Sequence, residues 1–324
     1  MGRPRLAFGI FSRLLVVLLL TLLLLTNCSQ GDGTTVDLES VVGNFVEKVP
    51  GRGSEGMTLP TTAESDRFIE ALRAAQGGDL DQAKRLAADL DYQVRGVTDA
   101  PTGRLLYLFE EQRAEDGSWP HGWGLYVVAA HPSRPLMIEV PHPVYDINTP
   151  EVGVAAFRHG DAEALLIAGA HRYANADGSS DVAHEVDTMF ARVNQALVDD
   201  RHVVLQPHGF NDEGSDSTDY GDVVVSAGTA APPPAVLAVT TALRTAGFDV
   251  CEYDGDSCTA LGATRNVEGV WCRKVGATFV HVELDRDVRE NPDQRTLVAR
   301  TAMDALERAG VLDVPSATAS RTGP

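Results

Sequence analysis

The chain from Pro135 onward alternates short apolar runs with amphipathic stretches. Each apolar run has the length of a strand, and the series is LMIEV from Leu136, LLIAGA from Leu165, VVLQ from Val203, VVVSAG from Val223 and TFVHVEL from Thr278. Strands that alternate with helices are typical of parallel sheets covered on both faces. The pattern predicts an α/β fold, a three-layer sandwich with a mostly parallel sheet.

Helix signals fill the gaps between these runs. Thr149, Pro150 and Glu151 supply an N-cap, a proline at the first helical position and an acid in the first turn. Ser180 or Asp181 is predicted to cap a second helix, because apolar residues follow at helical spacing at Val182, Val186, Met189, Val193 and Leu197. Further helices are predicted over residues 234–246 and 292–309.

Residues 37–130 precede this pattern, and we interpret them as an accessory region. Apolar residues recur at helical spacing on both sides of Gly77-Gly78, which predicts a helical hairpin. GRLLYLFEEQ and GWGLYVVAAH then predict two strands that lead into the core. The α/β domain is placed at 131–312 and a disordered tail at 313–324.

The first 28 residues resemble an export signal. Arginines precede an apolar run from Leu14 to Leu25, which is shorter than the about 20 residues that a membrane span needs. The letters LTNC, ending at Cys28, resemble a bacterial lipobox, although Asn27 replaces the small residue of that motif. The resemblance implies an exported protein that is membrane-anchored through lipidated Cys28 and tethered by a polar linker over 29–36. An ordinary secretory signal and an uncleaved anchor are the alternatives.

Charge excludes one class of partner. The chain carries 46 acidic and 27 basic residues, which gives a formal net charge of -19. Such a charge repels phosphate backbones, so we expect no nucleic-acid partner.

The cysteines beyond Cys28 lie close together in the sequence. Export places them in an oxidising compartment, where disulfides persist. Cys251 with Cys258 would close an acidic loop, and Cys258 with Cys272 would close a longer one. The sequence leaves both pairings open.

Three predicted strands end on a histidine, and these are His142, His171 and His208. In an open α/β sheet, ligands bind at the carboxyl ends of the strands. Catalytic zinc takes three nitrogen or oxygen ligands from the protein and keeps a fourth position for water. His142, Asp146 and His208 supply such a set.

The order of three motifs adds a family resemblance. HPVYD, LQPHGF and FVHVELDRDVR follow one another over roughly residues 135 to 290. Their order resembles the zinc carboxypeptidase and deacylase superfamily, which includes succinylglutamate desuccinylase-like enzymes and the N-formylglutamate and poly-gamma-glutamate hydrolases. The resemblance implies a zinc ion on His142, Asp146 and His208, with Glu283 as the general base. The carboxypeptidases have Glu three residues after the first His, whereas Asp146 comes four residues after His142.

The motif AHRYAN lies between the two proposed zinc motifs. Carboxypeptidases of the superfamily carry there an Asn-Arg pair that binds the substrate carboxylate. The resemblance implies that Arg172, with His171, binds substrate, since a guanidinium suits a carboxylate. In the alternative, Arg172 pairs with Asp177 or Asp181 and orders the loop.

The metal ligands and the base each have an alternative. Asp181 and His184 are spaced three apart and form a competing ligand pair, and either His184 or His171 could replace Asp146. Glu283 shares one face of its predicted strand with an aromatic and a histidine, which favours a base beside a metal. An acid at a strand end is otherwise a solvated rim residue, paired here with one of two arginines at positions 286 and 289.

These observations predict an exported, zinc-dependent hydrolase that cleaves an amide bond of a peptide or acyl-amino-acid substrate. The sequence has no GxSxG elbow, no P-loop and no GxGxxG after a strand. A peptidoglycan amidase is the enzymatic alternative, because it uses a similar zinc site and suits an exported protein. A non-catalytic surface lipoprotein with a hydrolase-like fold is the other.

Overall fold

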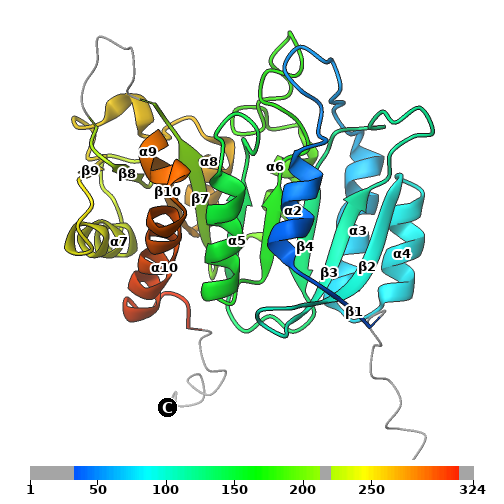
Figure 1. Ribbon diagram of the computed structural model, residues 1–324, viewed down its shortest axis with the longest axis horizontal. Coiled ribbons are helices and arrows are strands. Elements are labelled where there is room, and N and C mark those ends of the chain that lie inside the picture. The colour runs from blue at the N-terminus through cyan, green and yellow to red at the C-terminus, as the bar shows by residue number, and fades with distance from the viewer. Residues whose placement is uncertain (1–32, 212–219, 314–324) are drawn as a thin grey trace, which may run out of the picture. The chain divides into compact units, whose positions relative to one another are not determined.

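The computed structural model describes residues 33–211 and 220–313. Contacts divide the chain into residues 1–30 and 31–324, and all the described residues belong to the second unit. Their strands form a mixed sheet in the order β1-β2-β3-β4-β6-β5-β7-β10-β8-β9 (Figure 1). The strands are β1 (Thr34–Val36), β2 (Tyr92–Asp99), β3 (Leu105–Glu111), β4 (Leu125–Ala129), β5 (Leu136–Val140), β6 (Ala164–Ile167), β7 (Val203–Gly209), β8 (Val223–Ser226), β9 (Val250–Glu252) and β10 (Thr278–Leu284).

The centre of the sheet is parallel. β6, β5, β7 and β10 are successive parallel neighbours, and β1 and β2 pair in parallel, as do β8 and β9. The pairs β2–β3, β3–β4, β4–β6 and β8–β10 are antiparallel. The predicted α/β class with a mostly parallel sheet is confirmed.

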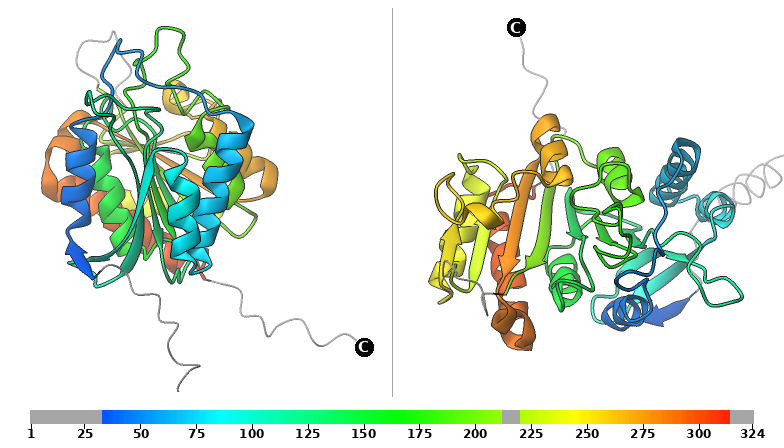
Figure 2. Two further views of the ribbon diagram at one scale, coloured as in Figure 1. Left: turned by 90° about the vertical axis from the view of Figure 1, so that its right-hand side faces the viewer. Right: turned by 90° about the horizontal axis from the view of Figure 1, so that it is seen from above.

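Helices cover both faces of the sheet (Figure 2). Each face buries its own apolar cluster. One face packs against α2 (Leu38–Val46), α5 (Thr149–His159), α7 (Pro234–Thr245) and α10 (Pro292–Arg308). The other face packs against α3 (Thr62–Gln76), α4 (Leu80–Ala88), α6 (Met189–Leu197) and α8 (Val267–Val275). Shorter elements are α9 (Arg286–Glu290) and the 3-10 helix η1 (Thr259–Leu261). These are the three layers that the sequence predicts.

The region before residue 130 is part of the same sheet. The predicted hairpin around Gly77-Gly78 is observed as α3 and α4, and the two predicted strands as β3 and β4. β4 pairs with β6, so the sheet continues across the predicted boundary at residue 130. The end of the predicted linker is also a strand, because residues 34–36 satisfy their backbone groups by pairing with β2.

Two predicted helix starts differ in the structure. The helix expected from Ser180 or Asp181 begins at Met189, where the side chain of Thr188 accepts a hydrogen bond from the Ala191 amide (3.1 Å). Residues 181–187 form turns instead. At the start of α5 the N-cap position is Asn148, while the Thr149 hydroxyl donates to the Asp146 carbonyl (2.7 Å).

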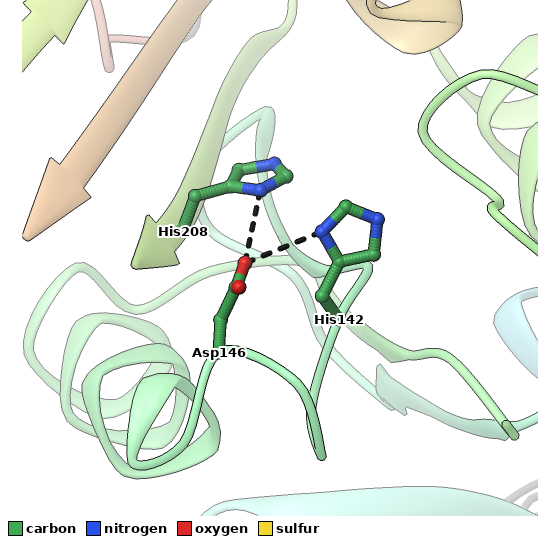
Figure 3. A group of neighbouring side chains, drawn as sticks. All are labelled: His142, Asp146 and His208. Atoms are coloured by element: carbon green, nitrogen blue, oxygen red, sulfur yellow. Dashed lines mark hydrogen bonds and ion pairs between the residues drawn. The ribbon is translucent and has the colours of Figure 1, made fainter. Parts of the chain in front are cut away.

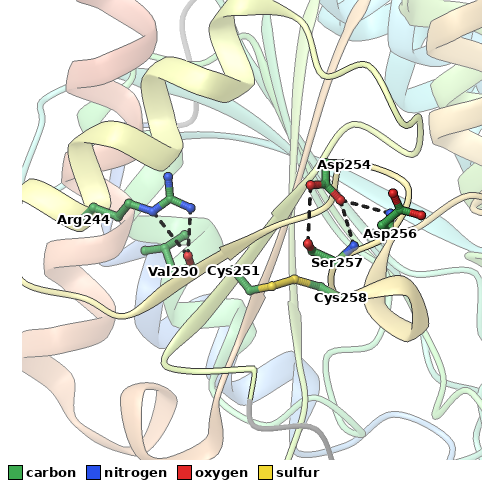
Figure 4. The surroundings of a disulfide bond; sticks show 7 residues. All are labelled: Arg244, Val250, Cys251, Asp254, Asp256, Ser257 and Cys258. Atoms are coloured by element: carbon green, nitrogen blue, oxygen red, sulfur yellow. Dashed lines mark hydrogen bonds between the residues drawn. A yellow bond between two sulfur atoms is a disulfide. The ribbon is translucent and has the colours of Figure 1, made fainter.

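The disulfide joins Cys251 to Cys258, the shorter of the two predicted loops (Figure 4). Within that loop, Asp254 accepts hydrogen bonds from the backbone amides of Asp256 and Ser257. Cys272 is a buried free thiol. The predicted signal and Cys28 lie outside the described residues. Among the described residues no helix combines the length and apolar character that a membrane span requires.

Candidate metal centre

The carboxyl ends of β5 and β7 place two histidines at one edge of the sheet. His208 is part of β7, and His142 follows β5 after one proline. The chain turns directly after His142, because the Asp146 amide donates to the His142 carbonyl (2.8 Å). This turn brings the Asp146 carboxylate back toward both imidazole rings.

Three ligand atoms meet at this point (Figure 3). Oδ2 of Asp146 lies 3.2 Å from Nδ1 of His142 and 3.2 Å from Nδ1 of His208. All three side chains are buried. Two imidazole nitrogens and one carboxylate oxygen are one of the donor sets that catalytic zinc takes from proteins. The residues present therefore fit a zinc ion, which His142, Asp146 and His208 would hold.

Charge in the cluster depends on contacts among its members. Burial raises the pKa of Asp146, but the hydrogen-bonding contacts with His142 and His208 outweigh it and hold that pKa well below its usual range. Burial lowers the pKa of His142, and its contacts with Asp146 and Asp181 reverse the shift to a net rise. Burial dominates for His208 and lowers its pKa to about 4, so that ring is neutral at pH 7. Asp146 and His208 are therefore in the forms that bind metals, a carboxylate and a neutral imidazole, whereas His142 would release a proton when a metal binds.

Asp181 lies behind His142 on the side away from Asp146. Its Oδ1 is 2.9 Å from Nε2 of His142, and its Oδ2 contacts Arg172 (2.5 Å) and Nδ1 of His184 (3.2 Å). A carboxylate there accepts a hydrogen bond from Nε2–H of His142, so that Nδ1 would be the ring nitrogen that binds a metal at the centre. The competing pair of Asp181 and His184 belongs to neither of the possible metal groups found among the described residues.

His171 and Arg172 lie beside the centre with two tyrosines. The Arg172 guanidinium lies over the rings of Tyr145 (5.2 Å to the centroid) and Tyr173 (5.3 Å), and it donates to Asp181. Nδ1 of His171 accepts from the Tyr173 amide (2.9 Å). Arg172 thus makes one of the two ion pairs of the loop-ordering alternative, while the substrate role of both residues stays a prediction.

Glu283 reaches the centre from β10. β10 is parallel to β7, with Glu283 in register with His208. Glu283 is 9% exposed, and its Oε2 has no hydrogen-bond partner among the described residues. Burial, followed by the negative charge of Asp146, raises the pKa of Glu283 to about 8. The solvated-rim alternative is wrong, because the side chain is buried.

His281 was not predicted as a site residue, and it is the histidine that shares the strand face of Glu283. Its Nε2 lies 3.7 Å from Oε1 of Glu283, and its ring centroid lies 4.6 Å from that of His208. His208, His281 and Glu283 form a second group whose ligand atoms lie within 4.8 Å of one another. Strand alternation was the signal that could have identified His281, because it places His281 and Glu283 on one face.

Arg289 connects the segments that carry the site, and sequence reasoning missed this role. Its buried guanidinium group donates to the carbonyls of Leu284 at the end of β10 (3.1 Å), Ile147 beside the Asp146 turn (2.7 Å) and Phe210 after β7 (2.8 Å). Gly209 leaves room for it, since a Cβ there would collide with Nε of Arg289. The ends of β7 and β10 and the loop that carries Asp146 are thereby fixed relative to one another.

No family model and no curated protein matches the chain. Among solved structures, it is similar to an N-formylglutamate amidohydrolase from Ralstonia eutropha JMP134, with 13% identity, a TM-score of 0.39, and 55% of this chain and 96% of that chain covered. It is also similar to a metallo-carboxypeptidase from Burkholderia cenocepacia, with 14% identity, a TM-score of 0.36, and 76% of this chain and 69% of that chain covered. It is similar as well to the ectoine utilization protein EutE (DoeB) from Ruegeria pomeroyi, with 14% identity, a TM-score of 0.39, and 65% of this chain and 69% of that chain covered. None of these similarities is strong enough to assign a family, so the function is argued from the site.

Proposed function

We propose that the protein is a zinc-dependent hydrolase that cleaves an amide bond in a peptide or acyl-amino-acid substrate. The observation that carries the proposal is the position of Asp146 Oδ2, 3.2 Å from one ring nitrogen of each of two buried histidines. Zinc bound there would polarise a substrate carbonyl and lower the pKa of water. A buried carboxyl group beside the same centre supplies the acid and base.

Glu283 moves the proton in this proposal. A cation at the centre favours the ionised form of a nearby carboxyl group, so it brings the pKa of Glu283 down from about 8 toward neutrality. A base with a pKa near the working pH is the most effective. Oε2 of Glu283 has no partner among the described residues, so it is the atom that takes a proton from the attacking water and returns it to the leaving amine.

Arg172 and His171 orient the substrate. The Arg172 guanidinium is held by Asp181 and by the rings of Tyr145 and Tyr173, which are 44% and 39% exposed. A positioned guanidinium suits a substrate carboxylate, and the exposed rings offer apolar surface to the acyl or side-chain part. This arrangement favours substrates that carry a free carboxylate next to the scissile amide.

Export and membrane attachment are part of the proposal. The basic residues, apolar run and Cys28 at the start of the chain support a lipoprotein whose catalytic unit lies outside the cytoplasm. Labelled fatty acid should be incorporated into the wild-type protein and not into Cys28→Ser. Equal labelling of both would contradict the lipid anchor.

The activity is tested with a panel of N-acyl amino acids, peptides and purified cell wall, incubated with zinc-loaded protein. Release of the acyl group or terminal residue from small substrates is expected, and Glu283→Gln, which keeps the zinc ligands, is the matched inactive control. Release of stem peptides from cell wall alone would identify a peptidoglycan amidase. No turnover of any substrate by zinc-loaded protein would favour a binding protein.

A further inference from the structure

A buried polar network lies on the far side of His208 from Asp146. Nε2 of His208 is 2.8 Å from Oε1 of Gln206, and this oxygen also accepts from Nδ2 of Asn266 (2.5 Å). Nε2 of Gln206 donates to Oε2 of Glu139 (3.2 Å) and to Oε2 of Glu268 (3.3 Å). All of these residues are at least 95% buried. Polar groups are costly to bury, so a network of this size calls for a role.

The orientation of Asn266 is fixed by the backbone of α8. Asn266 is the N-cap of that helix, and its Oδ1 accepts from the Gly269 amide (2.8 Å). A backbone N–H can only donate, so Oδ1 must face the helix. The amide nitrogen of Asn266 must then face Gln206.

The orientation of Gln206 follows from both of its sides. Toward Asn266 it must present Oε1, because the Asn266 nitrogen donates there. Toward Glu139 and Glu268 it presents Nε2, which donates to a carboxyl oxygen of each. Rotating the amide by half a turn would place two N–H groups against each other at the Asn266 side. Gln206 is therefore constrained from two directions.

The orientation of Gln206 in turn determines the tautomer of His208. Oε1 of Gln206 can only accept, so Nε2 of His208 carries the proton and Nδ1 keeps the lone pair. Nδ1 is the nitrogen that faces Asp146, as Figure 3 shows. Oδ2 of Asp146 is the competing acceptor, but its contact with Nδ1 is the longer one, 3.2 Å against 2.8 Å from Nε2 to Gln206. A cation at the centre would then be bound by the Nδ1 lone pair.

We propose that Asn266 and Gln206 are positioning residues that set the tautomer of His208, so that the N-cap of α8 prepares Nδ1 as a ligand for a divalent cation before the metal binds. The inference rests on the proposed function only in placing the metal at His142, Asp146 and His208. The two histidines therefore differ in the acceptor that faces Nε2, which is the carboxylate of Asp181 for His142 and the neutral amide of Gln206 for His208.

Three substitutions distinguish the proposed positioning role from simple packing in the core. Gln206→Met keeps the length of the side chain and removes the acceptor for His208. Gln206→Glu keeps an acceptor at that place. Asn266→Asp keeps the helix cap but removes the donor that orients Gln206, so the Gln206 amide can rotate and donate to Nε2 of His208. If Gln206 and Asn266 only filled space, the three variants would not differ in the tautomer of His208.

The test uses full-length protein labelled with 15N-histidine, first without metal. Long-range 1H–15N correlation spectra identify which ring nitrogen of His208 is protonated. We expect the Nε2–H form in the wild-type protein and in Gln206→Glu, a mixture in Gln206→Met, and a shift toward the Nδ1–H form in Asn266→Asp. Gln93→Met, an exposed change on β2, is the control and should leave the spectrum of His208 unchanged.

Zinc affinity is then measured by competition with a chelator. Loss of a partner that orients a metal-binding histidine typically costs 10- to 100-fold in affinity, so about that loss is expected in Gln206→Met and Asn266→Asp. The inference is overturned if wild-type His208 carries its proton on Nδ1, or if Gln206→Met changes neither tautomer nor affinity. Failure of the wild-type protein to bind zinc would contradict the proposed function, while the metal-free tautomer would still decide this inference.

Discussion

Glu283 lies opposite His208 in the parallel pair of β10 and β7. Register partners in neighbouring strands project from the same face of a sheet. The proposed base and one proposed metal ligand are therefore carried by two hydrogen-bonded strands and not by loops. Sites on such elements keep their geometry well, which suits a reaction in which a proton moves over a fixed distance.

Metal content is the first prediction. The purified protein should contain about one zinc ion per chain, and His142→Ala and His208→Ala should each lose it, because either change removes one of only three protein ligands. Elemental analysis after dialysis measures this. His131→Ala, which changes an exposed histidine, should keep the metal. If the two ligand variants retain a full complement of zinc, the metal lies elsewhere.

Glu283→Gln should greatly reduce turnover without loss of the metal. The amide has the shape of the acid but cannot take a proton from water, and general-base catalysis contributes typically 10²- to 10⁴-fold to the rate. We expect kcat to fall by about that factor while zinc content stays unchanged. Glu290→Gln, on the exposed part of α9, should behave as wild type. An unchanged kcat in Glu283→Gln would remove Glu283 from the mechanism.

The sequence predicts the ends of strands better than the starts of helices in this chain. His142, His208 and Glu283 were identifiable because each ends an apolar run, and parallel strands bring such ends to one edge. The helix expected from Ser180 or Asp181 begins only at Met189. Val182 is buried as its apolar pattern requires, but in a turn, because burial constrains where a side chain lies and not the backbone conformation that brings it there.

The buried network was not predictable from spacing. Gln206 and Glu139 are visible as polar residues inside apolar strands, but Asn266, the partner of Gln206, is 60 residues away from it in the sequence. Such a contact depends on how α8 packs on the sheet, and no local pattern reports that. The same holds for Arg289, whose acceptors are backbone carbonyls and carry no sequence signal.

Asp181→Asn should weaken zinc binding without removing a ligand. The carboxylate of Asp181 accepts from Nε2 of His142 and keeps Nδ1 available, whereas an amide can present its nitrogen and favour the other tautomer. We expect zinc affinity, measured against a chelator, to fall by about 10- to 100-fold. Asp177→Asn changes an exposed aspartate of the same loop and is the matched control. Equal affinities for the two variants would count against this role.

The disulfide should stabilise the fold without affecting the centre. Cys251 and Cys258 are 7 residues apart, and closing a loop of that length is worth about 2.5 kcal/mol in the chain-entropy model. Urea unfolding of Cys251→Ser with Cys258→Ser should show a loss near that value. Zinc content should be unchanged, because neither cysteine belongs to a possible metal group of the described residues. Loss of zinc in the folded double variant would show that the loop supports the centre.

The contribution of Glu283 to the stability of the metal-free protein should fall as the pH rises from about 4.5 to 8. Burial raises the pKa of Glu283 to about 8, whereas in the unfolded chain a glutamate titrates near 4.3. Between these values the folded state holds a proton that the unfolded state has released, so each rise in pH favours unfolding. The contribution is fully present below the unfolded pKa and is lost as the pH passes 8.

Burial also raises the pKa of Glu139, to about 7, so its contribution to stability falls with rising pH as well. Comparison of the wild-type protein with Glu283→Gln isolates the contribution of Glu283. The glutamine does not titrate, so the variant should have a melting temperature close to that of the wild-type protein at pH 5 and a higher one at pH 8. Saturating zinc should narrow the gap, because the cation stabilises the ionised carboxyl group. Parallel curves for the metal-free proteins across this range would mean that Glu283 is already ionised at neutral pH without a metal.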